Sequence, residues 1–159
     1  MGDRRVTIDW PTLTRTLRPE NSPGFLLWQV TNQWQRRMRA TLEPLGLTHV
    51  QFVLLAGLAW LEHKEGAVSQ ARLAQFCKTD AMMTSQVVRT LEKAGLIIRS
   101  SSEQDARAKA LKVTEAGAER LNQAMPAMLE ADAAFFRPLQ GGTAEAVAIF
   151  RSLLSGQGR

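Results

Sequence analysis

Side chains suited to reading DNA bases occur between residues 81 and 94. One face of a helix over this range would carry Met82, Ser85, Gln86 and Arg89, because these positions recur at helical spacing. A glutamine can pair with adenine, an arginine can pair with guanine, and a methionine can lie against a thymine methyl group. This face therefore suits the major groove of DNA, although an ordinary helical hairpin with a polar outer face would contain the same residues.

The helix over 81–94 needs a partner for its inner face, and the preceding helix over 70–77 can supply it. The residues expected to pack are Thr84, Val87, Val88 and Leu91 on one helix and Leu73, Ala74 and Phe76 on the other. The expected boundaries are an N-cap at Ser69, a break at Lys78-Thr79, an N-cap at Asp80 and a left-handed glycine at Gly95. Two helices joined in this way are typical of a helix-turn-helix.

A basic hairpin follows these two helices. Two strands are predicted, Leu96–Arg99 and Lys109–Thr114, around a polar segment that is too long for a tight turn. Arg107 and Lys109 can reach a phosphate or a narrow minor groove, and Asp105 can orient Arg107 by a charge-assisted hydrogen bond. A helix-turn-helix with a basic hairpin is a winged helix-turn-helix.

These motifs resemble a known family. The run Leu73–Ile97, with the wing motif Asp105-x-Arg107-x-Lys109 and then Leu111-x-Val113-Thr114-Glu115-x-Gly117, is similar to the DNA-binding core of the MarR (multiple antibiotic resistance regulator) family. The resemblance covers about residues 22–155. The chain departs from the family pattern at Lys78, where many relatives have glycine, and at Met82 and Met83, which are often polar in relatives.

The resemblance implies a mainly α fold with a small β-wing, in which a winged helix-turn-helix domain joins a helical dimerisation domain. The expected regions are an N-terminal arm over 1–21, dimerisation segments over 22–46 and 115–155, and a DNA-binding domain over 47–114. It implies a homodimer that binds double-stranded DNA at a pseudo-palindrome, with half-sites about 10 bp apart. Ser85, Gln86 and Arg89 would read or position on DNA, Arg107 would be the wing-tip arginine, and Asp105 would orient it.

The remaining segments are predicted to be helical, apart from the first twenty residues, which have the pattern of an arm with little structure of its own. The first expected helix starts at Ser22-Pro23 and ends at Pro44-Gly46, and the second starts at a Thr48–Gln51 capping box and runs to about Glu62, before Gly66. The third starts at Thr114 and runs to about Leu139, and the fourth starts at Thr143 and runs to Leu154. Pro126 should kink or divide the third of these helices.

Composition and charge exclude several classes of protein. The 159 residues are 45% hydrophobic and carry a net charge of +5, and the stretch 70–112 holds eight basic against four acidic side chains. A single cysteine cannot form an internal disulfide, and the longest apolar run, 52–61, is about half the length of a membrane span. A cytoplasmic location with no membrane association is expected.

Neither an enzyme nor a metal site is predicted. The sequence shows no nucleophile–base arrangement and no phosphate-binding glycine loop, so no catalytic residue and no cofactor is expected. His49 and His63 are 14 positions apart, about 21 Å along a helix, which is too far for a shared metal. Cys77 is interpreted as a small buried apolar residue rather than a redox sensor.

A ligand cleft is a further expectation, because effectors of the resembled family bind between the dimerisation helices and the DNA-binding lobe. A small aromatic acid could stack on Trp28 or Trp60 and pair with Arg39 or His49, although indole rings in such helices more often belong to a dimer or domain core. The predicted function is a transcriptional regulator, in most such proteins a repressor, that a ligand releases from DNA. The alternative is a winged-helix protein-interaction or non-specific nucleoid-binding module without a ligand.

Overall fold

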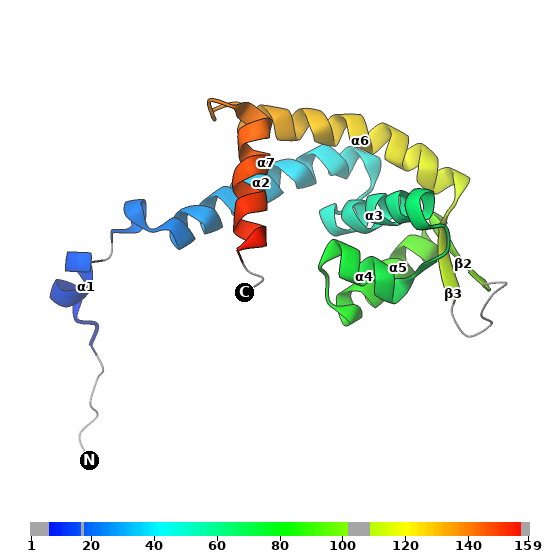
Figure 1. Ribbon diagram of the computed structural model, residues 1–159, viewed down its shortest axis with the longest axis horizontal. Helices are drawn as coiled ribbons and strands as arrows, with labels where there is room; N and C mark the ends of the chain where they lie inside the picture. Colours follow the sequence, from blue (N-terminus) through cyan, green and yellow to red (C-terminus); the bar gives the residue numbers. More distant parts are fainter. Residues whose placement is uncertain (1–6, 17, 102–108, 157–159) are drawn as a thin grey trace, which may run out of the picture. The chain divides into compact units, whose positions relative to one another are not determined.

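The computed structural model describes residues 7–16, 18–101 and 109–156. The chain divides into two compact units, Met1–Arg36 and Arg37–Arg159. The helices are α1 (Trp10–Thr16), α2 (Pro23–Leu42), α3 (His49–Glu65), α4 (Gln70–Cys77), α5 (Ala81–Lys93), α6 (Glu115–Phe136) and α7 (Gly142–Ser155). The strands are β1 (Val68–Ser69), β2 (Ile97–Ser101) and β3 (Lys109–Val113) (Figure 1). The predicted mainly helical fold with a small β-wing is confirmed.

The first unit contains α1 and most of α2, and here one prediction is wrong. The N-terminal arm has a helix of its own, because the Asp9 carboxylate accepts hydrogen bonds from the Thr12 backbone N–H (3.2 Å) and hydroxyl (2.7 Å). Pro11 in the first turn also suits a helix start. The predicted start of α2 is confirmed, and the Phe25 N–H lies 3.4 Å from the Ser22 hydroxyl.

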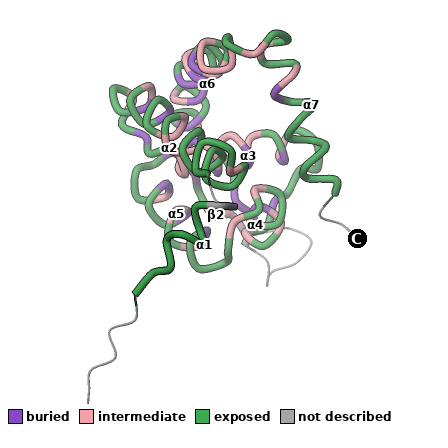
Figure 2. The backbone as a smooth tube through the Cα atoms, turned by 90° about the vertical axis from the view of Figure 1, so that its left-hand side faces the viewer, coloured by how far each residue is buried: buried purple, intermediate pink, exposed green. Residues whose placement is uncertain are grey.

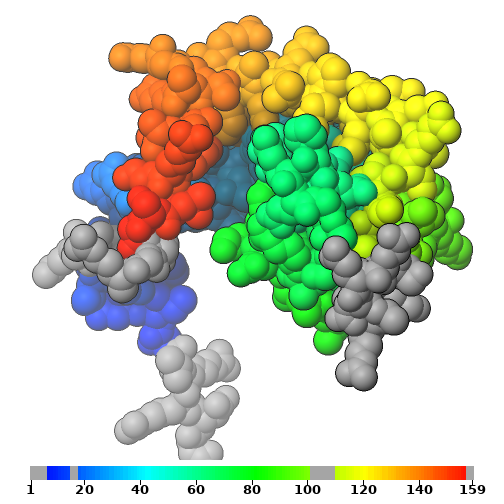
Figure 3. Space-filling model, turned by 45° about the vertical axis from the view of Figure 1, so that its right-hand side comes forward, coloured from blue at the N-terminus to red at the C-terminus, as the bar shows by residue number. Residues whose placement is uncertain are grey.

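The core of the second unit is built around α3. Its buried side chains include Phe52, Leu54, Leu55, Leu58 and Leu61, and the helix contacts α4, α5, α6 and the sheet. Figure 3 shows the surfaces of α3 to α5, in teal and green, lying under that of α6, in yellow. Buried residues gather in this part of the unit, whereas α7 is exposed along most of its length (Figure 2).

The ends of α3 follow from its sequence. The predicted capping box is present: the Thr48 hydroxyl accepts from the Gln51 N–H (3.3 Å), and the Gln51 side chain accepts from the Thr48 N–H (2.8 Å). The helix ends at Glu65, three residues beyond the predicted Glu62, and Gly66 follows it as the C-cap with φ 81°. The preceding turn closes as expected, with Pro44 in a 3-10 turn, Glu43–Leu45, and Gly46 in the left-handed region.

The sheet has three antiparallel strands in the order β1-β3-β2. Strand β2 pairs with β3 from Ile97↔Val113 to Ser101↔Lys109, which confirms the predicted hairpin strands. Strand β1 pairs Val68 with Leu111, and it was not predicted because two residues are too few to show an alternating pattern. The Glu62 carboxylate of α3 accepts a hydrogen bond from the Val113 N–H at 2.8 Å, which ties the core helix to the central strand.

Helix α6 starts where it was predicted to start, and packs tightly on the chain before β2. The Thr114 hydroxyl accepts from the Gly117 N–H (3.0 Å) and donates to the Gly95 carbonyl (2.7 Å). Gly117 lies so close to the Leu96 carbonyl that a Cβ at this position would overlap the carbonyl oxygen. The need for glycine at position 117 is therefore steric.

The later part of the second unit narrows one expectation and corrects another. Helix α6 continues through Pro126 to Phe136, so of the two expected effects of the proline, a kink or a division, the division does not occur. Thr143 does not cap α7, because the helix already begins at Gly142 and Gly141 is its N-cap. The Glu145 carboxylate accepts from the Gly141 N–H (2.9 Å) and takes the place of a capping hydroxyl.

Within the described residues, no single helix is both long and apolar enough to cross a membrane, and only the bent pair Pro23–Leu45 and His49–Glu65 reaches that length and composition together.

Candidate nucleic-acid interface

The turn between α4 and α5 sets the direction of α5. As predicted, the Ser69 hydroxyl accepts from the Arg72 N–H (3.1 Å) and the Asp80 carboxylate accepts from the Met83 N–H (2.8 Å). Lys78 is left-handed, with φ 54°, and is the one residue other than glycine with a positive φ in the described part of the chain. The backbone at Lys78 therefore adopts the left-handed conformation that glycine favours.

The inner face of α5 forms part of the core. Val88 and Leu91 are buried, and so is Leu73 of α4 opposite them. Thr84 is fully buried: its hydroxyl donates to the Asp80 carbonyl (2.7 Å) and lies 2.7 Å from the Thr79 hydroxyl. The predicted face is thus confirmed for these positions, and the two threonines stabilise the turn.

Phe76 departs from the predicted packing. Its side chain is 42% exposed, and the Arg72 guanidinium lies over its ring at 5.9 Å from the centroid. Only one edge of the ring reaches inward, where it lies near Gly57 of α3 together with Cys77. Gly57 leaves the space that both side chains occupy, and so α4 packs against α3 partly through this glycine.

The outer face of α5 brings most of the predicted DNA-reading residues together. Met82, Gln86 and Arg89 are exposed and Ser85 is half-buried. A shallow depression of about 570 Å³ is lined by Met82, Gln86, Arg89, Thr90 and Lys93. Thr90 and Lys93 were not predicted, although each lies four residues after a predicted position, and this spacing could have identified them.

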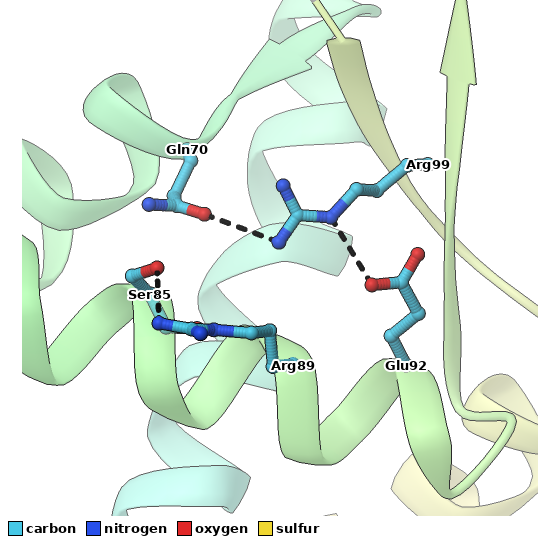
Figure 4. A network of polar contacts seen from close by, with 5 residues as sticks. All are labelled: Gln70, Ser85, Arg89, Glu92 and Arg99. Carbon is cyan, nitrogen blue, oxygen red and sulfur yellow. Dashed lines mark hydrogen bonds and ion pairs between the residues drawn. The ribbon is translucent and has the colours of Figure 1, made fainter.

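Arg89 is held by its own helix. Its Nε lies 3.3 Å from the Ser85 carbonyl and one terminal nitrogen lies 3.3 Å from the Ser85 hydroxyl (Figure 4). Ser85 thus keeps the guanidinium close to the helix surface. The other donors of the fork stay available, because a guanidinium has five N–H groups.

Arg99 connects the wing to both helices of the helix-turn-helix. From β2, its Nε donates to the Glu92 carboxylate of α5 (3.1 Å) and a terminal nitrogen donates to the Gln70 side chain of α4 (3.5 Å) (Figure 4). Both charged side chains are partly exposed. Sequence reasoning missed this contact, because the partners are 7 and 29 positions away and belong to different elements.

The wing is described only in part. Asp105 and Arg107 lie outside the described residues, and of Lys109 only the backbone, at the start of β3, is described. Lys112 of β3 is exposed.

Two of the predicted ligand-binding residues lie near one another. Arg39 lines a depression of about 460 Å³ with Glu43, Gly46, Leu47 and Thr48, and His49 follows directly. His49 is half-buried; burial lowers its pKa, the Asp132 carboxylate opposes that shift, and Arg39 adds to it. The site thus combines a permanent cation with an imidazole that burial keeps neutral.

The two predicted tryptophans are not part of this depression. Trp60 is 54% exposed, lies about 16 Å from His49 along α3, and is covered by the Lys64 ammonium at 5.1 Å from the ring centroid. Trp28 belongs to the first unit, where it is exposed and stacks on Phe25 with 6.0 Å between centroids.

Metal binding and thiol chemistry were the remaining possibilities for the side chains that the structure describes. The described residues include no cluster of three or more His, Cys, Asp or Glu that could hold a metal ion. Cys77 is half-buried, its sulfur lies 3.8 Å from the Val53 carbonyl, and burial raises the pKa of the thiol. A raised pKa reduces the thiolate fraction and hence the reactivity.

Comparisons with known proteins agree with this geometry. The family model described as MarR family matches residues 47–109. The uncharacterized HTH-type transcriptional regulator YdcH of Bacillus subtilis is 48% identical over 118 residues, 74% of this chain and 80% of that protein. The HTH-type transcriptional repressor Rv2887 of Mycobacterium tuberculosis is 31% identical over 110 residues, 69% of this chain and 76% of that protein.

A solved structure shares the fold. This is a structure of BpsR from Bordetella bronchiseptica, whose DNA binding is regulated by 6-hydroxynicotinic acid. It superposes on this chain with a TM-score of 0.76 at 22% identity, and the match covers 90% of this chain and 98% of that one.

Proposed function

Since the chain belongs to the MarR family of transcriptional regulators, we propose that it is a homodimeric repressor that binds a pseudo-palindromic operator and is released by a small aromatic acid. The outer face of α5 carries this proposal. There, Met82, Gln86, Arg89 and Lys93 form one exposed stripe, while the opposite face of the same helix is buried. A helix that is anchored on one side and presents base-reading side chains on the other suits the major groove.

The wing would supply the phosphate or minor-groove contacts. Arg107 and Lys109, with Asp105 as the orienting carboxylate, are proposed for this role from the sequence motif. Arg99 holds β2 against α4 and α5, so the base of the wing and the reading helix would move together. The excess of basic residues over 70–112 favours the same surface.

A second copy of the chain would cover the apolar surface of α7. Five large apolar side chains of this helix are exposed: Val147, Ile149, Phe150, Leu153 and Leu154. Exposed apolar side chains along one helix favour an interface. We therefore keep 22–46 and 115–155 as the dimerisation segments and 47–114 as the DNA-binding domain, with the arm 1–21 outside both.

The ligand would bind beside Arg39 and His49. An aromatic carboxylate can pair with the guanidinium of Arg39 and accept a hydrogen bond from the imidazole. The similarity in fold to BpsR, whose DNA binding 6-hydroxynicotinic acid regulates, supports this class of ligand. Trp60 lies too far along α3 to stack on a ligand in this depression.

Fluorescence anisotropy with the upstream region of the protein's own gene tests the DNA-binding part. Binding should be salt-sensitive and at least tenfold tighter than to a shuffled duplex. Arg89→Ala should cost about 1–3 kcal/mol per half-site, as expected for loss of an arginine–guanine pair. Arg18→Ala is the matched control, because it removes the same charge from an exposed position in the arm 1–21, which the proposal places outside the DNA-binding and dimerisation segments.

Two results would overturn the proposal. Equal affinity for the shuffled duplex would instead indicate a module that binds DNA without sequence preference. A monomer in sedimentation at the DNA-binding concentration would contradict the homodimer. For the ligand, 6-hydroxynicotinic acid and salicylate serve as probes, and Arg39→Ala should abolish any release that either produces.

A further inference from the structure

We propose that Met82 is a specificity-determining residue that contacts the C5-methyl group of thymine, beside the base that Gln86 reads. This inference rests on the proposed function and names the base chemistry that this chain selects.

The first observation is the exposure of Met82. At 81%, its side chain is the most exposed of the large apolar residues in the described part of the chain. It stands at the start of α5, in the first turn, where the N-terminal residues of a recognition helix contact base edges. An apolar side chain this exposed, on the face proposed to enter the groove, is free to contact an apolar group of the DNA.

The second observation is the placement of Met82 beside Gln86. Both line the same depression, four residues apart on one face of α5. Their separation along the helix is about 6 Å, which corresponds to no more than about two base-pair steps of 3.4 Å. Both side chains can therefore reach neighbouring base pairs.

The chemistry of the groove selects the partner. Among the four ordinary bases, only thymine carries a methyl group at the major-groove edge, beside the hydrogen-bond donors and acceptors found there. The flexible, polarisable thioether of methionine adapts to such a group. A cytosine at the same position would present a hydrogen at C5 in place of the methyl group, and an amino donor in place of the thymine O4 acceptor.

The test replaces thymine by uracil in the operator duplex found with the wild-type protein. Uracil lacks only the methyl group, so every hydrogen-bonding group is kept. Uracil at one symmetric pair of thymine positions should weaken binding of the wild-type protein about fourfold per half-site, as expected for the loss of one buried methyl group. All other thymine positions should change binding less than twofold.

Three variants identify the residue responsible. Met82→Gln keeps the length but not the apolar tip and should bind the thymine and uracil duplexes equally, whereas Met82→Leu should keep most of the discrimination. Met83→Ala is the matched control, because Met83 is 37% exposed and its side chain leaves the helix about 100° away from that of Met82. Thermal melting of each variant shows whether it is folded.

The outcomes are distinct. If specific binding exists but no thymine pair responds to uracil, or if Met82→Gln keeps the discrimination, the inference is wrong while the proposed function stands. If 5-methylcytosine at the responsive position binds tighter than thymine, the assignment to thymine is overturned. If no duplex is bound specifically, the proposed function itself fails.

Discussion

Gly117 provides a test of the packing between α6 and the segment before β2. We expect Gly117→Ala to destabilise the protein, although alanine is the better helix former. Gly117 lies in the first turn of α6, and a Cβ there would overlap the Leu96 carbonyl oxygen and approach Val113 Cγ1 to 2.9 Å. The carbonyl cannot swing away, because the same oxygen accepts a hydrogen bond from the Thr114 N–H at 3.1 Å.

The magnitude follows from two opposed contributions. Replacing glycine by alanine inside a helix gains up to about 1 kcal/mol, whereas forcing an extra methyl into a packed contact typically costs about 1–3 kcal/mol. The overlap here involves backbone rather than a flexible side chain, which places the cost at or above the upper end. The net loss should therefore be about 2 kcal/mol, equivalent to a fall in Tm of roughly 4–8 °C for a chain of this size.

Urea unfolding followed by circular dichroism at 222 nm measures the effect, at one protein concentration for all variants because a dimer melts in a concentration-dependent way. Gly24→Ala is the matched control. Gly24 lies in the first turn of α2 and a Cβ there meets nothing within 4 Å, so this variant should be as stable as the parent or slightly more stable. A Gly117→Ala protein as stable as the Gly24→Ala protein would refute the steric reasoning.

Three further predictions concern charge and capping. Because burial lowers the pKa of His49, protonation of the imidazole favours the unfolded chain. The contribution of neutral His49 to stability should therefore be complete above pH about 6.5 and should be lost as the pH falls from there through the lower pKa of the folded state. Melting at pH 7.5 and 5.5 should therefore show a smaller acid-induced loss for His49→Gln than for the parent, and equal losses would contradict the assignment. Thr48→Ala breaks the capping box with Gln51 and should cost about 1 kcal/mol in urea unfolding; no loss would mean that the box is not maintained in solution. Arg99→Ala should cost less than about 1 kcal/mol in stability, because the pair is partly exposed, yet should weaken DNA binding more than Lys112→Ala in anisotropy, and a reversed order would argue against a positioning role.

The caps and the inner face of α5 were predictable from sequence because their physics is local. Ser69, Asp80 and Thr114 each bond an N–H three residues ahead, so residue type and spacing were enough. Thr84 and Leu91 recur at helical spacing, and this predicted the buried face. The residues proposed to read DNA, on the outer face, followed as the complement of that pattern.

Contacts between distant segments were not predictable in this way. Nothing near Arg99 in the sequence indicates that it meets Gln70, and β1 is too short to show a strand pattern. The prediction of Thr143 as the N-cap of α7 was wrong for a different reason. The Glu145 carboxylate accepts a hydrogen bond from the Gly141 N–H, so a carboxylate inside the helix takes the place of the expected threonine hydroxyl. The helix in the arm was not predicted because Pro11 and Pro19 indicated an irregular segment, whereas Pro11 lies in the first turn, where proline is tolerated, and Asp9 caps that turn.

The separation of α5 into a buried face and an exposed stripe bears on how such regulators diverge. Thr84, Val88 and Leu91 maintain the fold, whereas Met82 and Gln86 contribute little to the core. Under the proposed function, single substitutions in the stripe after gene duplication would change the preferred operator of one copy at little cost in stability. Two copies can in this way acquire separate target genes while they keep the same scaffold, and engineers can redirect the protein by randomising the stripe alone.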